Sequence, residues 1–160
     1  AATIRVSHQY GYGDYKSMRI AGFASIHLSV VLMALCGIAY IVFRNYIPMI
    51  YTQDPMVREL AASLLIMSAL FQIFDATQLA SLACLRALAD VKIPLLQSLF
   101  SYYFVSLPMG YLFGFTLNMG AIGVWIGLLL GLAFASALFL YRFNSLSKKL
   151  ILKQNESYSI

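Results

Sequence analysis

Four long apolar segments dominate this 160-residue sequence, over residues 20–43, 57–89, 93–115 and 121–143. Each of them exceeds the ~20 residues that a helix needs to cross the hydrocarbon core of a bilayer. Hydrophobic residues make up 61% of the chain and charged residues only 11%. The segments therefore predict an all-α membrane protein, a bundle of transmembrane helices, rather than a water-soluble domain.

The basic residues lie at the ends of these segments and divide the connecting loops into two classes. One side carries nine of them: Arg5, Lys16, Arg19, Arg86, Lys92, Arg142, Lys148, Lys149 and Lys153. The other side carries only Arg44 and Arg58, beside Asp54 and Glu59. Since positively charged loops remain in the cytoplasm, we expect the loop at 11–19, the loop at 86–92 and the C-terminus to be cytoplasmic. The same distribution explains the net charge of +5 without nucleic acid as a partner.

The remaining stretches complete this expected topology. Residues 1–19 are interpreted as the end of a transmembrane helix and a cytoplasmic loop, so we expect the chain to be a fragment of a longer protein. Residues 44–56 form an outer loop, and residues 144–160 form a cytoplasmic tail. Asp54 followed by Pro55 is typical of a helix start. Pro108 and Gly110 predict a kink late in the third segment.

Asp75 is the only charged residue between positions 61 and 85. An ionised carboxylate inside the membrane costs about 2.5–3.5 kcal/mol on insertion scales, so such residues usually face a cavity and handle ions, protons or substrate. At 100° per residue, Ser68, Gln72 and Gln78 fall with Asp75 in a sector of roughly 120°. This polar stripe predicts a water-filled lumen, in which Asp75 would handle ions, protons or a charged substrate. The structural alternative is an acid that pairs with a neighbouring helix for assembly.

The third and fourth segments offer weaker signals. Tyr102, Tyr103 and Ser106 are candidates for substrate contact, because aromatic faces attract organic cations. Gly123, Gly127 and Gly131 repeat every four residues, which predicts close helix packing.

Three further patterns concern chemistry at the segment ends and in the chain as a whole. Arg86 and Asp90, four residues apart, have the spacing of an ion pair at a helix end, but we expect Arg86 to snorkel to the membrane surface. The lysines of the tail are expected to meet anionic membrane lipids. The sequence contains no phosphate loop, no Ser–His–Asp grouping and no metal-ligand cluster, so we expect neither an enzyme nor a cofactor.

Six sequence motifs follow one another in order along nearly the whole chain. The first is AATIRVSHQYGYGD at residues 1–14. It is followed by YTQDPMV at 51–57, FQIFDATQ at 71–78, LRALADVKIP at 85–94, LPMGY at 107–111 and GAIGVW at 120–125. Together they resemble the C-terminal half of multidrug and toxic compound extrusion (MATE) transporters of the NorM type, whose pattern for the first motif is A-A-x-x-R-V-G-x-x-x-G-x-G-D. Ser7, Ala87 and Ala89 replace family glycines, and Phe71 lacks the hydroxyl of a Tyr.

The resemblance implies a fold and a function. It makes the chain most of the C-terminal six-helix lobe of a twelve-helix transporter, with the N-terminal lobe as its partner. It implies a bacterial inner-membrane antiporter that exports cationic, amphipathic small molecules in exchange for Na⁺ or H⁺. In NorM-type members an acid in the tenth helix binds the coupling cation. The resemblance implies this cation-coupling role for Asp75, and it makes Asp75 a candidate Na⁺ ligand.

Two other functions remain open from the sequence. One is a lipid or lipid-linked oligosaccharide flippase of the same superfamily, although the four segments carry no mid-membrane Lys or Arg to match a pyrophosphate. The other is a membrane subunit without transport activity, in which Asp75 pairs with a basic residue of a partner.

Overall fold

The computed structural model describes residues 2–158 and contains only helices and turns within them. The first half holds α1 (Ala2–Gly11), α2 (Tyr15–Phe43), α3 (Ile47–Tyr51) and α4 (Pro55–Ala87). The second half holds α5 (Lys92–Phe100), η1 (Ser101–Ser106), α6 (Leu107–Tyr111), η2 (Leu112–Thr116) and α7 (Gly120–Tyr158). The protein is an all-α bundle, as the sequence predicts.

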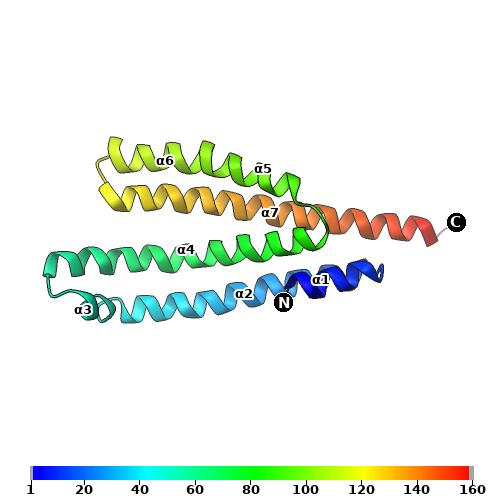
Figure 1. Cartoon of the computed structure of the whole chain (residues 1–160), viewed down its shortest axis with the longest axis horizontal. Coiled ribbons are helices and arrows are strands. Elements are labelled where there is room, and N and C mark those ends of the chain that lie inside the picture. Colours follow the sequence, from blue (N-terminus) through cyan, green and yellow to red (C-terminus); the bar gives the residue numbers. More distant parts are fainter. Residues whose placement is uncertain (1, 159–160) are drawn as a thin grey trace.

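The long helices lie side by side in the spatial order α2, α4, α7 and α5–α6 (Figure 1). The neighbours α4 and α7 run in the same direction, and α2 and α5–α6 run in the opposite one. The α1–α2 turn, the α4–α5 turn and the end of α7 gather at one end of the bundle. The short helix α3 and the η2–α7 turn lie at the opposite end. We call the first of these the basic end, since nine of the eleven basic residues belong to its loops and helix ends. The fold therefore separates the two classes of loops.

Local capping explains where α2 and α4 begin. The carboxylate of Asp14 accepts a hydrogen bond from the Ser17 N–H at 3.1 Å, so α2 begins at Tyr15, five residues before the expected apolar segment. Hydrogen bonding from the Ser17 side chain and backbone lowers the pKa of Asp14 below its ordinary value. Asp54 accepts from the Met56 N–H at 2.9 Å, and Pro55 occupies the first position of α4. Both caps satisfy backbone donors that a helix start leaves free.

α7 continues far beyond the apolar segment at 121–143, through Tyr158. No Gly or Pro interrupts residues 144–158, so nothing in the backbone ends the helix there. The expected tail is therefore helical where the structure describes it. Its Gln154 side chain donates a hydrogen bond to the Gly13 carbonyl at 2.7 Å, which joins the end of α7 to the α1–α2 turn.

The third apolar segment is not one regular helix. Within residues 2–158, three single helices (α2, α4 and α7) are long and apolar enough to cross a membrane. The third segment is divided into α5, η1, α6 and η2, with π-helical turns on both sides of Pro108. Proline lacks a backbone N–H and clashes with the carbonyl four residues earlier, which favours such a local change in hydrogen bonding.

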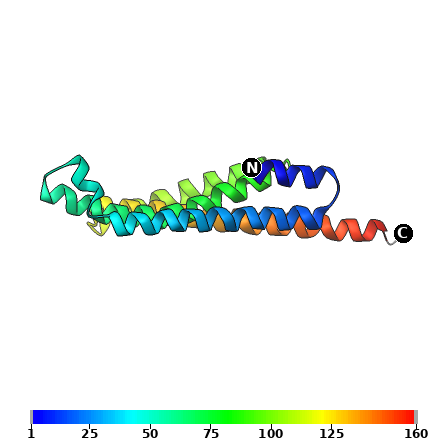
Figure 2. The same cartoon turned by 90° about the horizontal axis from the view of Figure 1, so that it is seen from below.

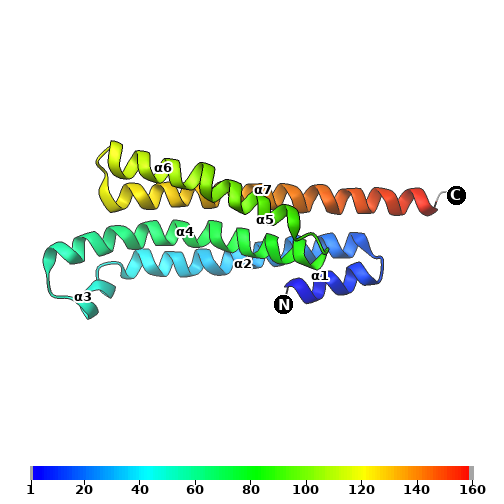
Figure 3. The ribbon, with the colours of Figure 1, turned by 45° about the horizontal axis from the view of Figure 1, so that its top comes forward.

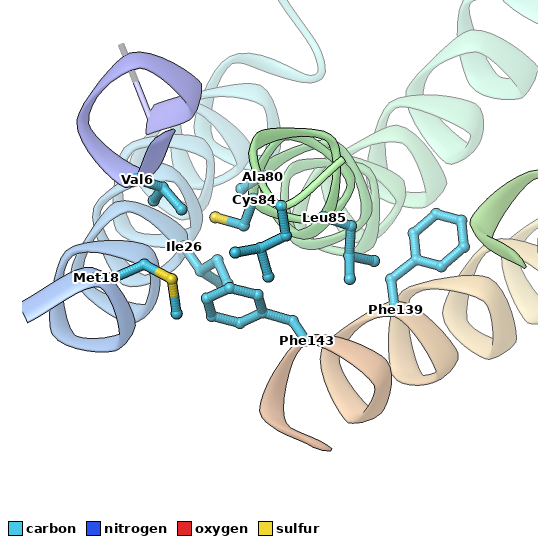
Figure 4. Close-up of a cluster of buried hydrophobic side chains, with 9 residues drawn as sticks. Val6, Met18, Ile26, Ala80, Cys84, Leu85, Phe139 and Phe143 are labelled. Atoms are coloured by element: carbon cyan, nitrogen blue, oxygen red, sulfur yellow. The ribbon is translucent and has the colours of Figure 1, made fainter. Parts of the chain in front are cut away.

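A buried hydrophobic cluster joins four helices near the basic end. Figure 4 shows side chains from α1, α2, α4 and α7 pointing toward one another around the ring of Phe143. The members are Val6, Met18, Ile26, Ala80, Cys84, Leu85, Leu88, Phe139 and Phe143. The cluster holds α1 against the bundle, because its members come from α1, α2, α4 and α7.

Small residues bring α7 close to the preceding helical segment. A Cβ added at Gly127 would lie 2.2 Å from the Gly110 backbone nitrogen, and one at Gly123 would lie 2.4 Å from the Phe113 carbonyl oxygen. At Gly131 the added atom would lie 2.4 Å from Cβ of Ser106. The predicted packing role of the glycine repeat is confirmed, because the backbones approach too closely for any side chain.

Asp90 does not use the four-residue spacing to Arg86, and no ion pair joins the two within residues 2–158. α4 ends at Ala87, and Ala89 adopts a positive φ of 59°, so Asp90 no longer continues the helical spacing from Arg86. Asp90 Oδ2 instead accepts a hydrogen bond from Arg142 Nε of α7 at 2.8 Å. The Arg142 side chain is 31% exposed and the Asp90 side chain 16% exposed. The turn between α4 and α5 is thereby attached to α7.

This attachment predicts a measurable coupling. Asp90→Asn should lower the free energy of unfolding by about 1–2 kcal/mol, because it weakens a hydrogen bond between charged groups. In a double-mutant cycle, Asp90→Asn with Arg142→Gln should show an interaction energy of about 1 kcal/mol. The matched cycle with Arg86→Gln should show none. Equal coupling in the two cycles would contradict the pairing. Thermal or denaturant unfolding in detergent supplies the four free energies of each cycle.

Candidate functional site

Asp75 lies in the middle of α4, and its side chain is half-buried. Within residues 2–158 the Asp75 side chain has no hydrogen-bond or ion-pair partner. No Lys or Arg occurs in the apolar segments at 20–43, 93–115 and 121–141. The histidine in these segments, His27, has its Nδ1 at 2.8 Å from the Phe23 carbonyl oxygen and forms no ion pair with Asp75. An acid in this setting attracts a cation or a proton.

Two glutamines accompany Asp75 on α4, each about one turn away. The Gln72 Oε1 atom is buried and has no hydrogen-bond partner among the described residues. Gln78 is buried, and its Oε1 accepts a hydrogen bond from the Tyr102 hydroxyl of η1 at 3.3 Å. The structure therefore brings together two of the residues that the sequence singled out from different segments. Gln72 offers an unused acceptor oxygen one turn from the acid.

An aromatic contact fixes the same part of α4 against α7. The Phe71 and Trp125 rings meet edge to face, with centroids 5.8 Å apart. Sequence reasoning treated Phe71 only as a residue without a hydroxyl and did not assign a contact to Trp125. The only feature of the sequence that could have pointed to this contact is that Trp125 is the single Trp in the chain. This contact orients the helix face next to Gln72.

The other candidate residues have different surroundings. Ser68 lines a cavity of about 490 Å³ beside α3, toward the end opposite the basic end. Tyr103 is 62% exposed and lines an apolar groove with Phe100 and Phe134. Ser106 is buried against Gly131, so it belongs to the packing between η1 and α7. Of the three, only Ser68 shares α4 with Asp75.

The chemistry of this site is that of a single acid with neutral oxygen donors. Carboxylate, amide and hydroxyl oxygens are the ligands that hard cations prefer. In the part of the chain that the structure describes, no group of three His, Cys, Asp or Glu side chains could hold a metal ion together. The arrangement thus offers one carboxylate, with amide oxygens of the same helix about one turn away on either side.

Comparison with known families decides the identity. The MatE family model matches residues 1–112. The chain belongs to the MATE family. It is 40% identical over 146 residues to the probable multidrug resistance protein NorM of Brucella suis, covering 88% of this chain and 31% of that protein. It is 33% identical over 153 residues to the multidrug resistance protein MdtK of Yersinia pseudotuberculosis, covering 93% and 34%. The chain therefore spans about a third of the length of these relatives.

Solved structures support the fold. The eukaryotic MATE transporter AtDTX14 superposes with a TM-score of 0.82 over 93% of this chain and 34% of that chain, at 23% identity. An inward-facing multidrug resistance MATE transporter of the MOP superfamily superposes with a TM-score of 0.83 over 93% and 34%, at 16% identity. This MATE chain is thus a multi-pass membrane protein with the helix arrangement of part of such a transporter.

Proposed function

We propose that this chain forms part of an antiporter that exports cationic, amphipathic compounds in exchange for Na⁺ or H⁺, with Asp75 as the coupling residue. The observation that carries the proposal is the uncompensated acid in the middle of α4, in a chain whose relatives are named multidrug resistance proteins. The N-terminal lobe of the same transporter would complete the translocation pathway.

The coupling follows from differential binding. When Asp75 is ionised, the free energy of keeping it inside the membrane is unfavourable, and it falls when the acid takes up Na⁺ or a proton. A cation that binds one conformation more tightly shifts the populations of the outward- and inward-facing states. If a cationic drug is attracted by the same carboxylate, ion binding lowers its affinity, and the two cargoes exchange.

We assign different residues around Asp75 to the two species that it would bind, the coupling ion and the organic cation. Gln72, with its free Oε1, is the best-placed additional ligand for Na⁺, whereas Ser68 and Gln78 extend the polar face along α4. Tyr102 joins this face through Gln78, so it is the aromatic residue that we assign to organic cations. Tyr103 and Ser106 are weaker assignments, since one lines a separate groove and the other is buried in packing.

The distribution of charge supports an orientation. We assign the basic end to the cytoplasm and α3 to the outer face of a bacterial inner membrane, following the excess of basic residues. In this orientation Asp75 lies between the two surfaces and can meet ions from outside and drugs from inside.

Transport by the whole protein that contains this chain tests the function. In cells or proteoliposomes loaded with ethidium, we expect efflux to accelerate when an inward Na⁺ or proton gradient is applied and to stop when that gradient is collapsed. The gradient that drives efflux identifies the ion. If wild-type protein moves no ethidium under either gradient but moves a fluorescent lipid across the bilayer, the antiporter proposal is wrong.

A further inference from the structure

A groove between α1 and α2 combines a cationic side chain with an apolar wall. The groove has a volume of about 440 Å³, and its lining includes Arg5, Gln9, Ser17, Ile20, Ala24 and Leu28. Figure 2 shows α1 lying to one side of α2, joined to it by a tight turn, and Figure 3 shows the two helices running alongside each other. The groove follows from this hairpin, since Val6 packs into the buried cluster while Arg5 points elsewhere.

The polar groups of the groove are available to a ligand. Within residues 2–158, the side chains of Arg5 and Gln9 have no hydrogen-bond or ion-pair partner. No acid lines the groove. Asp14, the acid that precedes α2, is engaged with Ser17. The groove therefore carries a net positive charge with unused hydrogen-bond donors.

The depth of Arg5 matches a membrane interface. Arg5 precedes the end of α1 by six residues, or about 9 Å at 1.5 Å per residue. Because α1 returns along α2, Arg5 lies near the level where the apolar segment of α2 begins, just after Arg19. Beyond that level the groove-lining residues of α2 are apolar except Ser25, whose hydroxyl donates a hydrogen bond to the Ala21 carbonyl at 2.8 Å. Ile20 and Leu28 are 70% and 64% exposed.

We propose that this groove is a binding site for one anionic phospholipid. The lipid phosphate accepts hydrogen bonds from the Arg5 guanidinium and the Gln9 amide, and one acyl chain lies along Ile20, Ala24 and Leu28. A guanidinium presents paired donors that match two phosphate oxygens. The apolar wall next to the charge favours a phosphate ester with a hydrocarbon chain over free phosphate. The proposal depends on the membrane location of the chain and not on its transport activity.

Native mass spectrometry of the whole protein in a neutral detergent tests the site. The probes are palmitoyl-oleoyl phosphatidylglycerol, the matching phosphatidylcholine and the soluble headgroup analogue glycerol 3-phosphate. We expect one phosphatidylglycerol to bind more tightly than the other two probes. Arg5→Gln should weaken that binding about ten-fold or more, as expected for loss of charge-assisted hydrogen bonds. Arg5→Lys, which keeps the charge, should retain part of it.

Arg86→Gln is the matched control, because Arg86 is exposed near the same end of the bundle and does not line the groove. It should leave the tight phosphatidylglycerol unchanged. Equal losses of phosphatidylglycerol affinity in Arg5→Gln and Arg86→Gln would overturn the site. No loss of affinity in either variant would also overturn it, and this is the result expected if another protein segment covers the groove. Glycerol 3-phosphate binding as tightly as the lipid would show a simple anion site and overturn the lipid assignment. The melting temperature of each variant confirms that it is folded.

Discussion

Asp75→Asn is expected to reduce gradient-driven ethidium efflux strongly while the protein still reaches the membrane. Asparagine has nearly the same shape as aspartate, but it cannot take up a proton and carries no charge for Na⁺. Typical coupling free energies between sites are 1–3 kcal/mol, so coupled transport should fall by about 5- to 150-fold. The measurement is the initial rate of efflux at equal protein abundance, with and without the driving gradient.

The control for this experiment is Glu59→Gln, which makes the same chemical change on the same helix. Glu59 lies near the start of α4, outside the apolar stretch at 61–85, and its side chain is exposed. Removal of its charge should leave the efflux rate close to that of the wild type. If Asp75→Asn also retains full coupled efflux, Asp75 is a structural residue and the proposed mechanism is wrong.

Gly127→Ala is expected to cause the largest loss of stability among single-methyl changes on α7. The added Cβ would lie 2.2 Å from the Gly110 nitrogen and 2.3 Å from its Cα, so only a movement of the backbone can accommodate it. Overpacking of this kind costs about 1–3 kcal/mol, and separation of two helices places it at the upper end. The higher helix propensity of alanine returns up to about 1 kcal/mol. We expect a net loss of about 2 kcal/mol and a fall of about 5 °C in the melting temperature.

Gly11→Ala provides the matched control, since a Cβ at Gly11 meets no atom within 4 Å. Both substitutions add the same methyl group, and only one adds it between two backbones. Thermal unfolding of the purified protein in detergent compares the two variants. A melting temperature for Gly127→Ala equal to that of Gly11→Ala would show that α6 and α7 are not held at this spacing.

The helices and their starts are largely readable from the sequence, because the forces that set them are local. Apolar length predicts the spans of α2, α4 and α7, and Asp54 followed by Pro55 predicts the start of α4. The Asp14 cap, which begins α2 five residues before the apolar segment, was not predicted. The glycine spacing at 123, 127 and 131 also predicts its role correctly, since any close helix contact needs small residues on one face. The unusual charge at Asp75 is visible without any structure, because its cost depends on the membrane and not on a neighbour.

The partners of the polar side chains were decided only by the tertiary structure. Asp90 pairs with Arg142 and not Arg86, because a left-handed residue at Ala89 ends the helical register on which the sequence argument depended. Gln78 meets Tyr102, and Phe71 meets Trp125, across helices whose relative rotation no local pattern specifies. The groove at Arg5 likewise exists only because the buried cluster holds α1 beside α2. Sequence periodicity determines which face of a helix is polar, whereas packing between distant segments determines what that face touches.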